Sequence, residues 1–487
     1  MKAKSLADIS RREFIRRAAC AAVGTAAMTA AIRDLRFMNA AVAQTNITDY
    51  KALICIFLAG GNDSNNLVLP TVTSEYNNYA SIRTPVLAIP SAAILNLNYT
   101  DTAGHAYGLH PACPQLQTLF GEGKLAFLLN TGTLAYPITR VQYQNNSVKK
   151  PPQLFSHADQ VTQWQTSWPD QPALTGWGGR VADLVNSVQP GAPISMSVSL
   201  AGANTFEVGN IVAQYNVSTT GAIQLQGVSG ARLAALTNIL GLAYSNMQAQ
   251  AYSDVTEHSI NVGSLLNNAI NATTNAGYWT NPFPTSVTSP TGGNAFTSSL
   301  SSQLKMIARL IEAGSRSAAS GGFGMKRQIF FCQVGGYDLH TGQTTYTVNN
   351  PNNVLVGPHA NLMAELSQSL FSFQRAMEQL GLAQKVTSFT ASDFGRTFPS
   401  NGQGSDHGWG SHHVICGGAV HGGQTYGKLP TLTVNGPDDT GTGRWIPTTA
   451  TDQYFATIAT WFGVDPGNLA TVFPNIGRFA SPNLGFL

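Results

Sequence analysis

The chain has 487 residues and a formal net charge of +3, from 27 Lys and Arg against 24 Asp and Glu. Residues 1–43 hold eight basic and three acidic residues, a net of +5, so the rest of the chain carries about −2. The basic balance therefore belongs to the N-terminus, and net charge excludes a general nucleic-acid-binding surface. About 440 further residues suffice for one large domain or two smaller ones.

The first 43 residues have the order of a twin-arginine export signal. Ser10-Arg11-Arg12-Glu13-Phe14 precedes an alanine-rich run over 18–32, and Ala41-Val42-Ala43 offers a cleavage site before Gln44. We therefore expect the twin-arginine machinery to export the chain to the periplasm or beyond. Since no later segment has eighteen uninterrupted apolar residues, we expect no stable membrane span in the mature chain.

Five short apolar runs predict strands, at residues 51–59, 125–130, 328–334, 385–391 and 413–416. Each ends in glycine or a polar cluster, as buried parallel strands do. A helix is predicted over 359–380, between Pro358 and Gly381. The order of strand, helix and strand predicts a right-handed βαβ unit, and the whole predicts an α/β domain over 44–487 with a mostly parallel sheet.

The segment at about 200–300 differs in composition from the rest. It is rich in Asn, Ser, Thr, Gly and Ala, with one helix-like stretch over 231–251. We interpret it as a polar insertion or cap on the α/β domain.

Carboxylates and imidazoles gather where the predicted strands end. Since open α/β sheets bind ligands beyond the carboxyl ends of their strands, we expect six of these side chains to share one region: Asp63, Asp338, His340, Asp393, His407 and His412. Anionic oxygens and neutral imidazoles are ligands of divalent metals, so one or two ions are predicted, with Zn, Mn, Ca and Mg left open. Each residue alone has a simpler explanation as a turn, cap or packed residue.

At this point the chain resembles a known family, through motifs that cover nearly all of its mature part. These are the export signal and Phe57-Leu58-Ala59-Gly60-Gly61-Asn62-Asp63, Leu109-His110-Pro111-Ala112, Phe155-Ser156-His157-Ala158-Asp159-Gln160, Thr175-Gly176-Trp177, Gly335-Gly336-Tyr337-Asp338-Leu339-His340, Ser392-Asp393-Phe394-Gly395-Arg396-Thr397, Asp406-His407-Gly408-Trp409-Gly410 and Gly422-Gly423-Gln424-Thr425-Tyr426-Gly427. They follow the order of the twin-arginine-exported family called domain of unknown function 1501. That family is similar in fold to the alkaline phosphatase and sulfatase superfamily.

The resemblance implies a three-layer sandwich with a metal site at the strand ends. Asp63 looks like the first ligand, Asp338 and His340 the middle pair, Asp393 the next carboxylate and His407 the final imidazole. Phe394 stands where an alkaline phosphatase has a histidine, which implies that one metal position is altered or missing. A sulfatase motif of Cys or Ser followed by x-Pro-x-Arg is absent from the sequence.

The resemblance also implies a hydroxyl nucleophile at a helix start. Ser156 is the first candidate, because helix amides there would hold an anionic ester, and its alternative role is an ordinary helix cap. Ser64 and Thr131 are further candidates. Arg396 or a second metal site is predicted to offset the charge that develops during transfer of a phosphoryl-type group.

Two classes of function follow. The first is an exported metal-dependent hydrolase acting on phosphate or related esters of a small molecule or polymer. The second is an exported binding or assembly protein that keeps the fold without the reaction. A polysaccharide hydrolase with paired carboxylates ranks last.

Overall fold

The computed structural model describes residues 47–487 apart from 224, 226 and 274–278. The export signal predicted over 1–43 therefore lies outside the described residues.

A ten-stranded sheet forms the centre of the molecule, in the order β14-β5-β13-β12-β1-β11-β6-β7-β8 with β15 beside β5. β1 (Lys51–Leu58) pairs in parallel with β11 (Arg327–Val334) on one side and with β12 (Val386–Ser392) on the other. The other strands are β5 (Leu125–Gly132), β6 (Ser197–Ser199), β7 (Tyr215–Ser218), β8 (Gly221–Ala222), β13 (Ser411–Gly417), β14 (Thr425–Gly427) and β15 (Thr449–Ala450). The predicted mostly parallel sheet is confirmed.

All five predicted strands are present, but one runs in the other direction. β13, predicted over 413–416 as a buried parallel strand, is antiparallel to both β12 and β5. A strand covered on both faces is apolar throughout whichever way it runs, so its composition does not reveal its direction. β11 and β12 flank the predicted helix in the chain, and β1 lies between them in the sheet.

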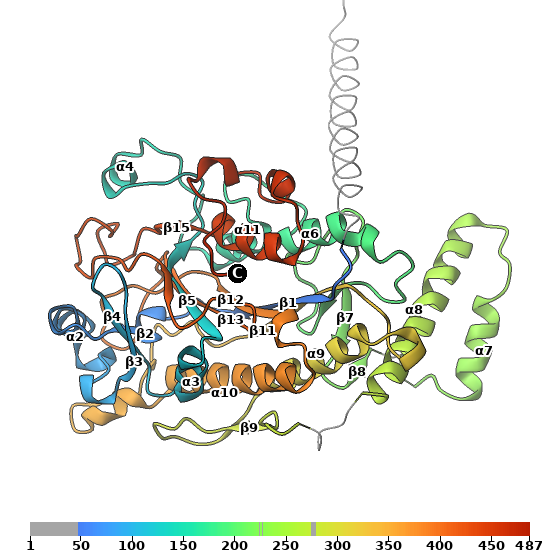
Figure 1. Ribbon diagram of the computed structural model, residues 1–487, viewed down its shortest axis with the longest axis horizontal. Coiled ribbons are helices and arrows are strands. Elements are labelled where there is room, and N and C mark those ends of the chain that lie inside the picture. Colours follow the sequence, from blue (N-terminus) through green and yellow to red (C-terminus); the bar gives the residue numbers. More distant parts are fainter. Residues whose placement is uncertain (1–46, 224, 226, 274–278) are drawn as a thin grey trace, which may run out of the picture.

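Helices cover both faces of this sheet, which makes the fold a three-layer sandwich (Figure 1). One face is covered by α10 (Pro358–Gln379), α9 (Ser299–Ser315) and α3 (Pro114–Gly121), and the other by α11 (Thr451–Phe462), α6 (Trp177–Val185) and α5 (His157–Thr166). Trp177 of α6 stacks on Phe455 of α11, with ring centroids 4.4 Å apart. Such aromatic contacts bury large apolar areas and hold this layer on the sheet.

Smaller elements complete the described chain. An antiparallel sheet of β2 (Val68–Pro70), β4 (Ala106–Leu109) and β3 (Leu95–Thr100) lies beside α2 (Thr73–Leu87), and β9 (Ser286–Val287) pairs with β10 (Phe296–Thr297). The short helices α4 (Arg140–Asn145) and α12 (Leu469–Val472) lie on the periphery. No helix among the described residues is both long and apolar enough to cross a bilayer.

The segment at 200–300 combines a sheet edge with a projecting helix pair. β7 and β8 extend the central sheet, whereas α7 (Ala231–Leu240) and α8 (Met247–Asn271) project from its side (Figure 1). The stretch predicted over 231–251 is thus two helices. The chain turns at Gly241, and the Asn246 side chain accepts from two backbone amides at the start of α8.

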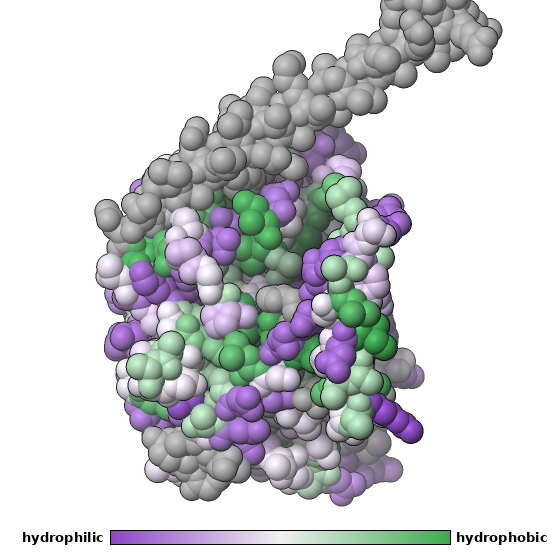
Figure 2. Space-filling model, turned by 90° about the vertical axis from the view of Figure 1, so that its right-hand side faces the viewer, coloured by the Kyte–Doolittle hydropathy of each residue, from purple (hydrophilic) through white to green (hydrophobic). Residues whose placement is uncertain are grey.

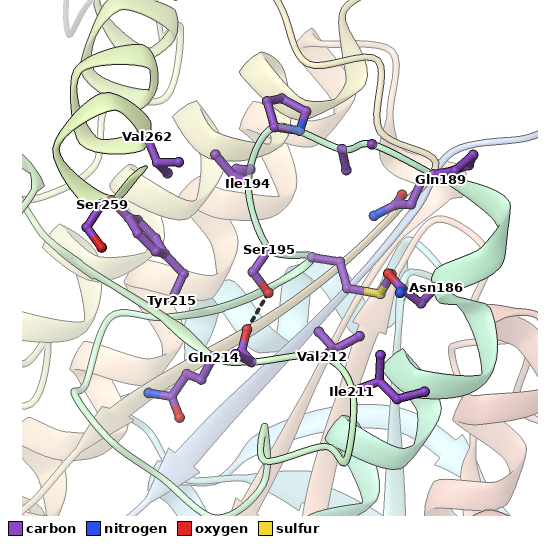
Figure 3. Close-up of a pocket in the computed structure, with 16 residues that line it drawn as sticks. Asn186, Gln189, Ile194, Ser195, Ile211, Val212, Gln214, Tyr215, Ser259 and Val262 are labelled. Atoms are coloured by element: carbon purple, nitrogen blue, oxygen red, sulfur yellow. Dashed lines mark hydrogen bonds between the residues drawn. The ribbon is translucent and has the colours of Figure 1, made fainter. Parts of the chain in front are cut away.

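A cavity of about 370 Å³ lies between α8 and the main body (Figure 3). Gln189, Ile194 and Tyr215 are among its lining residues, and Ser195 Oγ donates to the Ala213 carbonyl at its wall. None of the described residues that line this cavity is charged. Part of α8 is therefore held away from the body rather than packed on it.

Glu207 predicts a pH dependence of stability. Burial removes water from its carboxyl and raises the pKa of Glu207 to about 8. The hydrogen bond that Asn204 donates to Oε2 acts in the opposite sense but is the weaker effect. The folded protein keeps this proton up to about pH 8, while the unfolded chain releases it near its ordinary pKa. Stability therefore falls as pH rises toward 8 and levels off above it, by about 1.4 kcal/mol per pH unit.

We expect Glu207→Gln to remove the decrease between pH 7 and 8, as measured by urea unfolding. Asp452, buried with a pKa raised to about 7, acts in the same sense but mainly below pH 7, so this window isolates Glu207. An unchanged slope in the variant would show that another group is responsible.

Candidate metal centre

Three adjacent parallel strands deliver polar loops to one edge of the sheet. The loop after β1 begins at Gly60, the loop after β11 carries Asp338, and Asp393 follows β12 directly. Gly60 N donates to Asp393 Oδ1 at 2.9 Å, which ties two of these loops together. At this edge of the sheet lie four of the six predicted side chains, those of Asp338, His340, Asp393 and His407.

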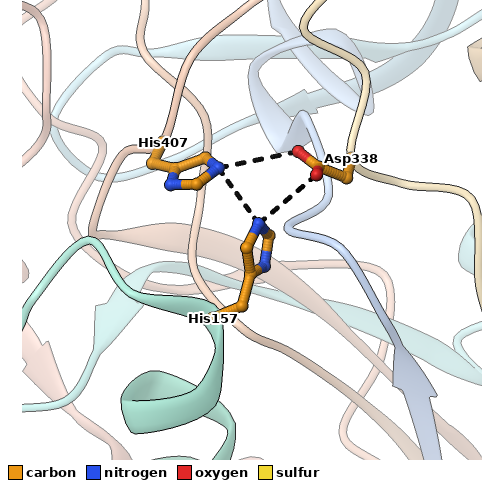
Figure 4. Close-up of side chains that lie close together, drawn as sticks. All are labelled: His157, Asp338 and His407. Carbon is orange, nitrogen blue, oxygen red and sulfur yellow. Dashed lines mark hydrogen bonds and ion pairs between the residues drawn. The ribbon is translucent and has the colours of Figure 1, made fainter.

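His157, Asp338 and His407 converge on one point (Figure 4). His157 Nε2 lies 3.0 Å from His407 Nε2 and 3.5 Å from Asp338 Oδ2, and His407 Nε2 lies 3.6 Å from Asp338 Oδ1. Ligands in a tetrahedral zinc site, with bonds near 2.0–2.1 Å, are about 3.3 Å apart. The two imidazole Nε2 atoms are close to this separation, and each lies slightly further from a different oxygen of Asp338.

The far nitrogens of both imidazoles are held by acceptors. His157 Nδ1 lies 2.6 Å from Asp393 Oδ2, and His407 Nδ1 lies 2.8 Å from the Phe155 carbonyl oxygen. A ring nitrogen that faces an acceptor carries the proton, which leaves the lone pair on Nε2. Metal-binding histidines are oriented in this way, so the arrangement fits a divalent ion.

Asp393, predicted as a ligand, supports His157 instead of joining the three converging atoms. Its two oxygens are occupied by Gly60 N and His157 Nδ1, and the side chain is buried. A carboxylate behind a histidine fixes the ring and increases its basicity. We assign Asp393 to this positioning role.

His340, another predicted ligand, lies beside the three converging side chains. Its Nε2 is 2.9 Å from His407 Nε2 and 3.2 Å from Asp338 Oδ1, while its Nδ1 is 2.9 Å from Asp406 Oδ1. The ring is 41% exposed. His340 therefore offers a further donor atom on the solvent side.

Arg396 is buried and locks the strand-end loops together. Its guanidinium donates to the Asp338 carboxylate and to four backbone carbonyls, those of Gly60, Gly61, Tyr337 and Ser405. Burial alone would raise the pKa of the Asp338 carboxyl, but the hydrogen bond and charge of Arg396 outweigh it and hold the pKa below its usual value. The structure thus gives Arg396 a part in positioning Asp338 that its predicted catalytic role did not include.

Phe394 packs against both imidazoles. Its ring centroid is 4.8 Å from that of His157 and 4.6 Å from that of His407. Burial lowers the pKa of His407, although the bond to the Phe155 carbonyl acts in the opposite sense, and the lowered pKa favours a neutral imidazole. Gly61 is required here, because a Cβ would come within 2.5 Å of the Phe394 ring. Phe394 therefore presents an apolar surface to both imidazoles.

Asp63 and His412, both predicted as ligands, are not among the three converging side chains of the described structure. Asp63 forms a buried ion pair with Arg83 and accepts from Gln343 Nε2. His412 lies on β13, where its Nδ1 accepts from Asn130 N and burial lowers its pKa to about 4. Both residues have structural partners that the strand-end pattern did not reveal.

Ser156 immediately precedes α5 and the site residue His157. Its hydroxyl donates to Asp159 Oδ2 at 2.6 Å and does not cap the helix amides. The predicted nucleophile therefore has a carboxylate in reach of its proton.

His157 was missed as a ligand from the sequence, although its motif was noted for Ser156. The only local feature that the sequence offered was the place of His157 at the start of a predicted helix, directly after the polar residue Ser156. Nothing in that local pattern shows that the ring turns toward loops some 180 and 250 residues further along the chain.

Comparisons with known proteins give one family and several distant folds. No curated protein matches the sequence. A crystal structure of Ps i-CgsB aligns with a TM-score of 0.34 and 8% identity, covering 89% of this chain and 78% of that one. PsFucS1 sulfatase from Pseudoalteromonas sp. aligns with a TM-score of 0.34 and 11% sequence identity, covering 90% of this chain and 73% of the sulfatase. The C-terminal periplasmic domain of EcEptC from Escherichia coli, in complex with Zn, aligns with a TM-score of 0.27 and 9% sequence identity. The alignment covers 76% of this chain and 74% of that domain.

Identities and TM-scores of this size carry no residue role from those proteins to this chain. The family model, in contrast, matches residues 50–471, which include every side chain of the candidate metal centre. On that match, the chain belongs to the family described as Protein of unknown function (DUF1501).

Proposed function

We propose that this protein is an exported metal-dependent hydrolase of phosphate or related esters, with one divalent ion between His157, Asp338 and His407. The observation that carries the proposal is the convergence of two imidazole Nε2 atoms on a carboxylate while both Nδ1 atoms face acceptors. Without an ion, the two facing Nε2 lone pairs repel each other at 3.0 Å. The ester class rests on the resemblance of the loops to the alkaline phosphatase superfamily.

The donor set favours a transition metal. Two imidazoles and one carboxylate suit zinc or manganese better than calcium or magnesium, which prefer oxygen ligands. Three protein ligands leave a position open, as catalytic zinc sites do. A bound ion would lower the pKa of a hydroxyl or water and polarise an ester oxygen. Asp338 is 48% exposed, so substrate has access to this side.

Ser156 is the proposed nucleophile and Asp159 the group that takes its proton. The hydroxyl and the carboxylate are 2.6 Å apart, within the reach expected of a nucleophile and its base. The free amides at the start of α5 favour an anion beside Ser156. His157, one of the proposed metal ligands, is the next residue in the chain.

We expect Ser156→Ala to lower kcat/KM by at least about 100-fold, since nucleophile and base act together. Metal content, measured by mass spectrometry of the purified protein, should stay the same. Thr162→Ala, on the exposed side of α5, is the control and should leave kcat/KM unchanged. Retained activity in Ser156→Ala would assign the attack to water.

The proposed function is tested with the exported protein, metal-loaded and chelator-treated, on phosphomonoester, phosphodiester and sulfate-ester substrates. Turnover should require the metal and should be lost in Asp338→Ala together with the ion. No turnover on any substrate, with an unchanged metal content in Asp338→Ala, would refute the proposal.

One observation favours the second function, an exported binding protein that keeps the fold. Phe394 replaces a polar ligand with an aromatic ring, and Arg396 is fully occupied by the protein itself. A protein of this kind would bind the metal without turnover on any of the esters.

A further inference from the structure

The projecting helix pair carries an unusual share of the exposed apolar surface. We call residues 223–271 the arm. Seven of the thirteen exposed large hydrophobic side chains among the described residues belong to it: Ile223, Leu225, Ile239, Leu242, Met247, Tyr252 and Leu265. Figure 2 looks onto this side of the molecule and shows apolar side chains interspersed with polar ones. Exposed apolar surface that gathers in one place marks an interaction site.

An apolar groove of about 310 Å³ runs along the arm. It is lined by residues of α8, among them Thr256 and Ile260, and by four apolar residues before α8: Ile223, Leu225, Val228 and Leu233. The groove is large enough for an aromatic side chain. Nothing in the described chain fills it.

Tyr252 projects from the same face of α8, one turn before the groove. It is 74% exposed, and its spacing to Thr256 and to Ser259 places all three on one side of the helix. A protruding ring and a groove of matching size thus lie side by side. Such a surface is complementary to itself.

We propose that a second copy of this chain docks on the arm about a two-fold axis that passes near Thr256. The two α8 helices then run antiparallel, and Tyr252 of each copy lies opposite Ile260 of the other, in the apolar groove. Two-fold contacts use the same patch on both subunits, so a ring and a groove on one face satisfy both halves at once.

The charge of the arm favours a second copy over other occupants. Arg232, Asp254 and Glu257 are the charged residues of 223–271. A nucleic acid or an anionic membrane would need a cluster of Lys and Arg. A nearly neutral surface does not repel its own copy and promotes association.

The size of the contact predicts a reversible dimer. Each tyrosine buries roughly 150–250 Å² when covered, so two rings and their grooves fall in the range of weak interfaces, below about 1,200 Å². We expect the dimer to dissociate on dilution and to form at micromolar concentration.

The first test measures the mass of the mature protein by sedimentation from roughly 1 to 100 μM. Wild type should pass from monomer to dimer, and Tyr252→Ala should raise the dissociation constant at least tenfold. Leu174→Ala, also an exposed apolar side chain (90%) but outside the arm, is the control and should dimerise like wild type. A monomer at every concentration, or a dimer that Tyr252→Ala leaves unchanged, overturns the proposal.

The second test locates the axis. A residue near a two-fold axis meets its own copy, so Thr256→Cys should form a disulfide-linked dimer under mild oxidation. Background is low because Cys55, Cys113, Cys332 and Cys416 are all buried. Val348→Cys, 84% exposed and outside the arm, is the control and should stay uncrosslinked. A dimer that forms without a Thr256→Cys link, or a monomer that binds neutral lipid vesicles instead, contradicts the proposed arrangement.

Discussion

Alanine in place of His157 is expected to remove the metal ion and, with it, the hydrolytic activity. The change deletes one of three converging donors and leaves His407 and Asp338 to bind alone. Loss of a group that only orients a ligand already lowers metal affinity about 10- to 100-fold, so the loss of the ligand should exceed 100-fold. Titration calorimetry with zinc measures the affinity, and mass spectrometry the metal content.

Asp393→Asn provides the graded comparison. The variant keeps His157 but replaces the carboxylate behind it with a weaker acceptor, and zinc affinity should fall by about 10- to 100-fold. His421→Ala is the control, because that histidine is exposed and its imidazole bonds to the Gly485 carbonyl oxygen at the surface. Equal zinc affinity in wild type and His157→Ala would remove the basis of the proposed centre.

Replacing Arg83 with methionine should destabilise the fold by about 3–5 kcal/mol, the cost of leaving one member of a buried ion pair alone. Arg83 is fully buried, pairs with Asp63, and donates to the carbonyl oxygens of Thr397 and Phe398. Burial raises the pKa of Asp63, but Arg83 and the other donors around it lower the pKa below its usual value, so the carboxylate is charged. Urea unfolding at pH 7 measures the loss.

The double variant Arg83→Met with Asp63→Asn should recover part of that stability, since neither charge is then buried. Lys149→Met is the surface control. Lys149 is 53% exposed in its ion pair with Asp170, and its loss should cost less than about 1 kcal/mol. Equal effects of Arg83→Met and Lys149→Met would show that the buried pair contributes little.

Asp63→Asn also decides whether Asp63 is a ligand. If Asp63 serves only its structural partners Arg83 and Gln343, the folded variant should keep its full metal content. A folded variant without metal would instead support the role that the family resemblance implied.

The strands could be predicted because each one buries both faces. In β1 every residue from Ala52 to Leu58 is buried, and such runs are visible without any knowledge of their neighbours. The order of the strands in the sheet could not be predicted in this way. β1 lies between β11 and β12, which follow it by more than 250 residues, and pairing at that separation leaves no local trace in the sequence.

The sequence by itself determined which strands end in loops rich in carboxylates and imidazoles, because buried strands and the polar residues after them are local patterns. It placed Asp338, His340, Asp393 and His407 in one region, and the structure brings these four together. Only the tertiary structure decided what each one does. The direction of a side chain depends on contacts between distant segments. His157 on α5 therefore points its Nε2 toward Asp338 and His407, and Asp393 contacts the other ring nitrogen of His157. Arg396 donates its hydrogen bonds to Asp338 and to carbonyl oxygens of the strand-end loops.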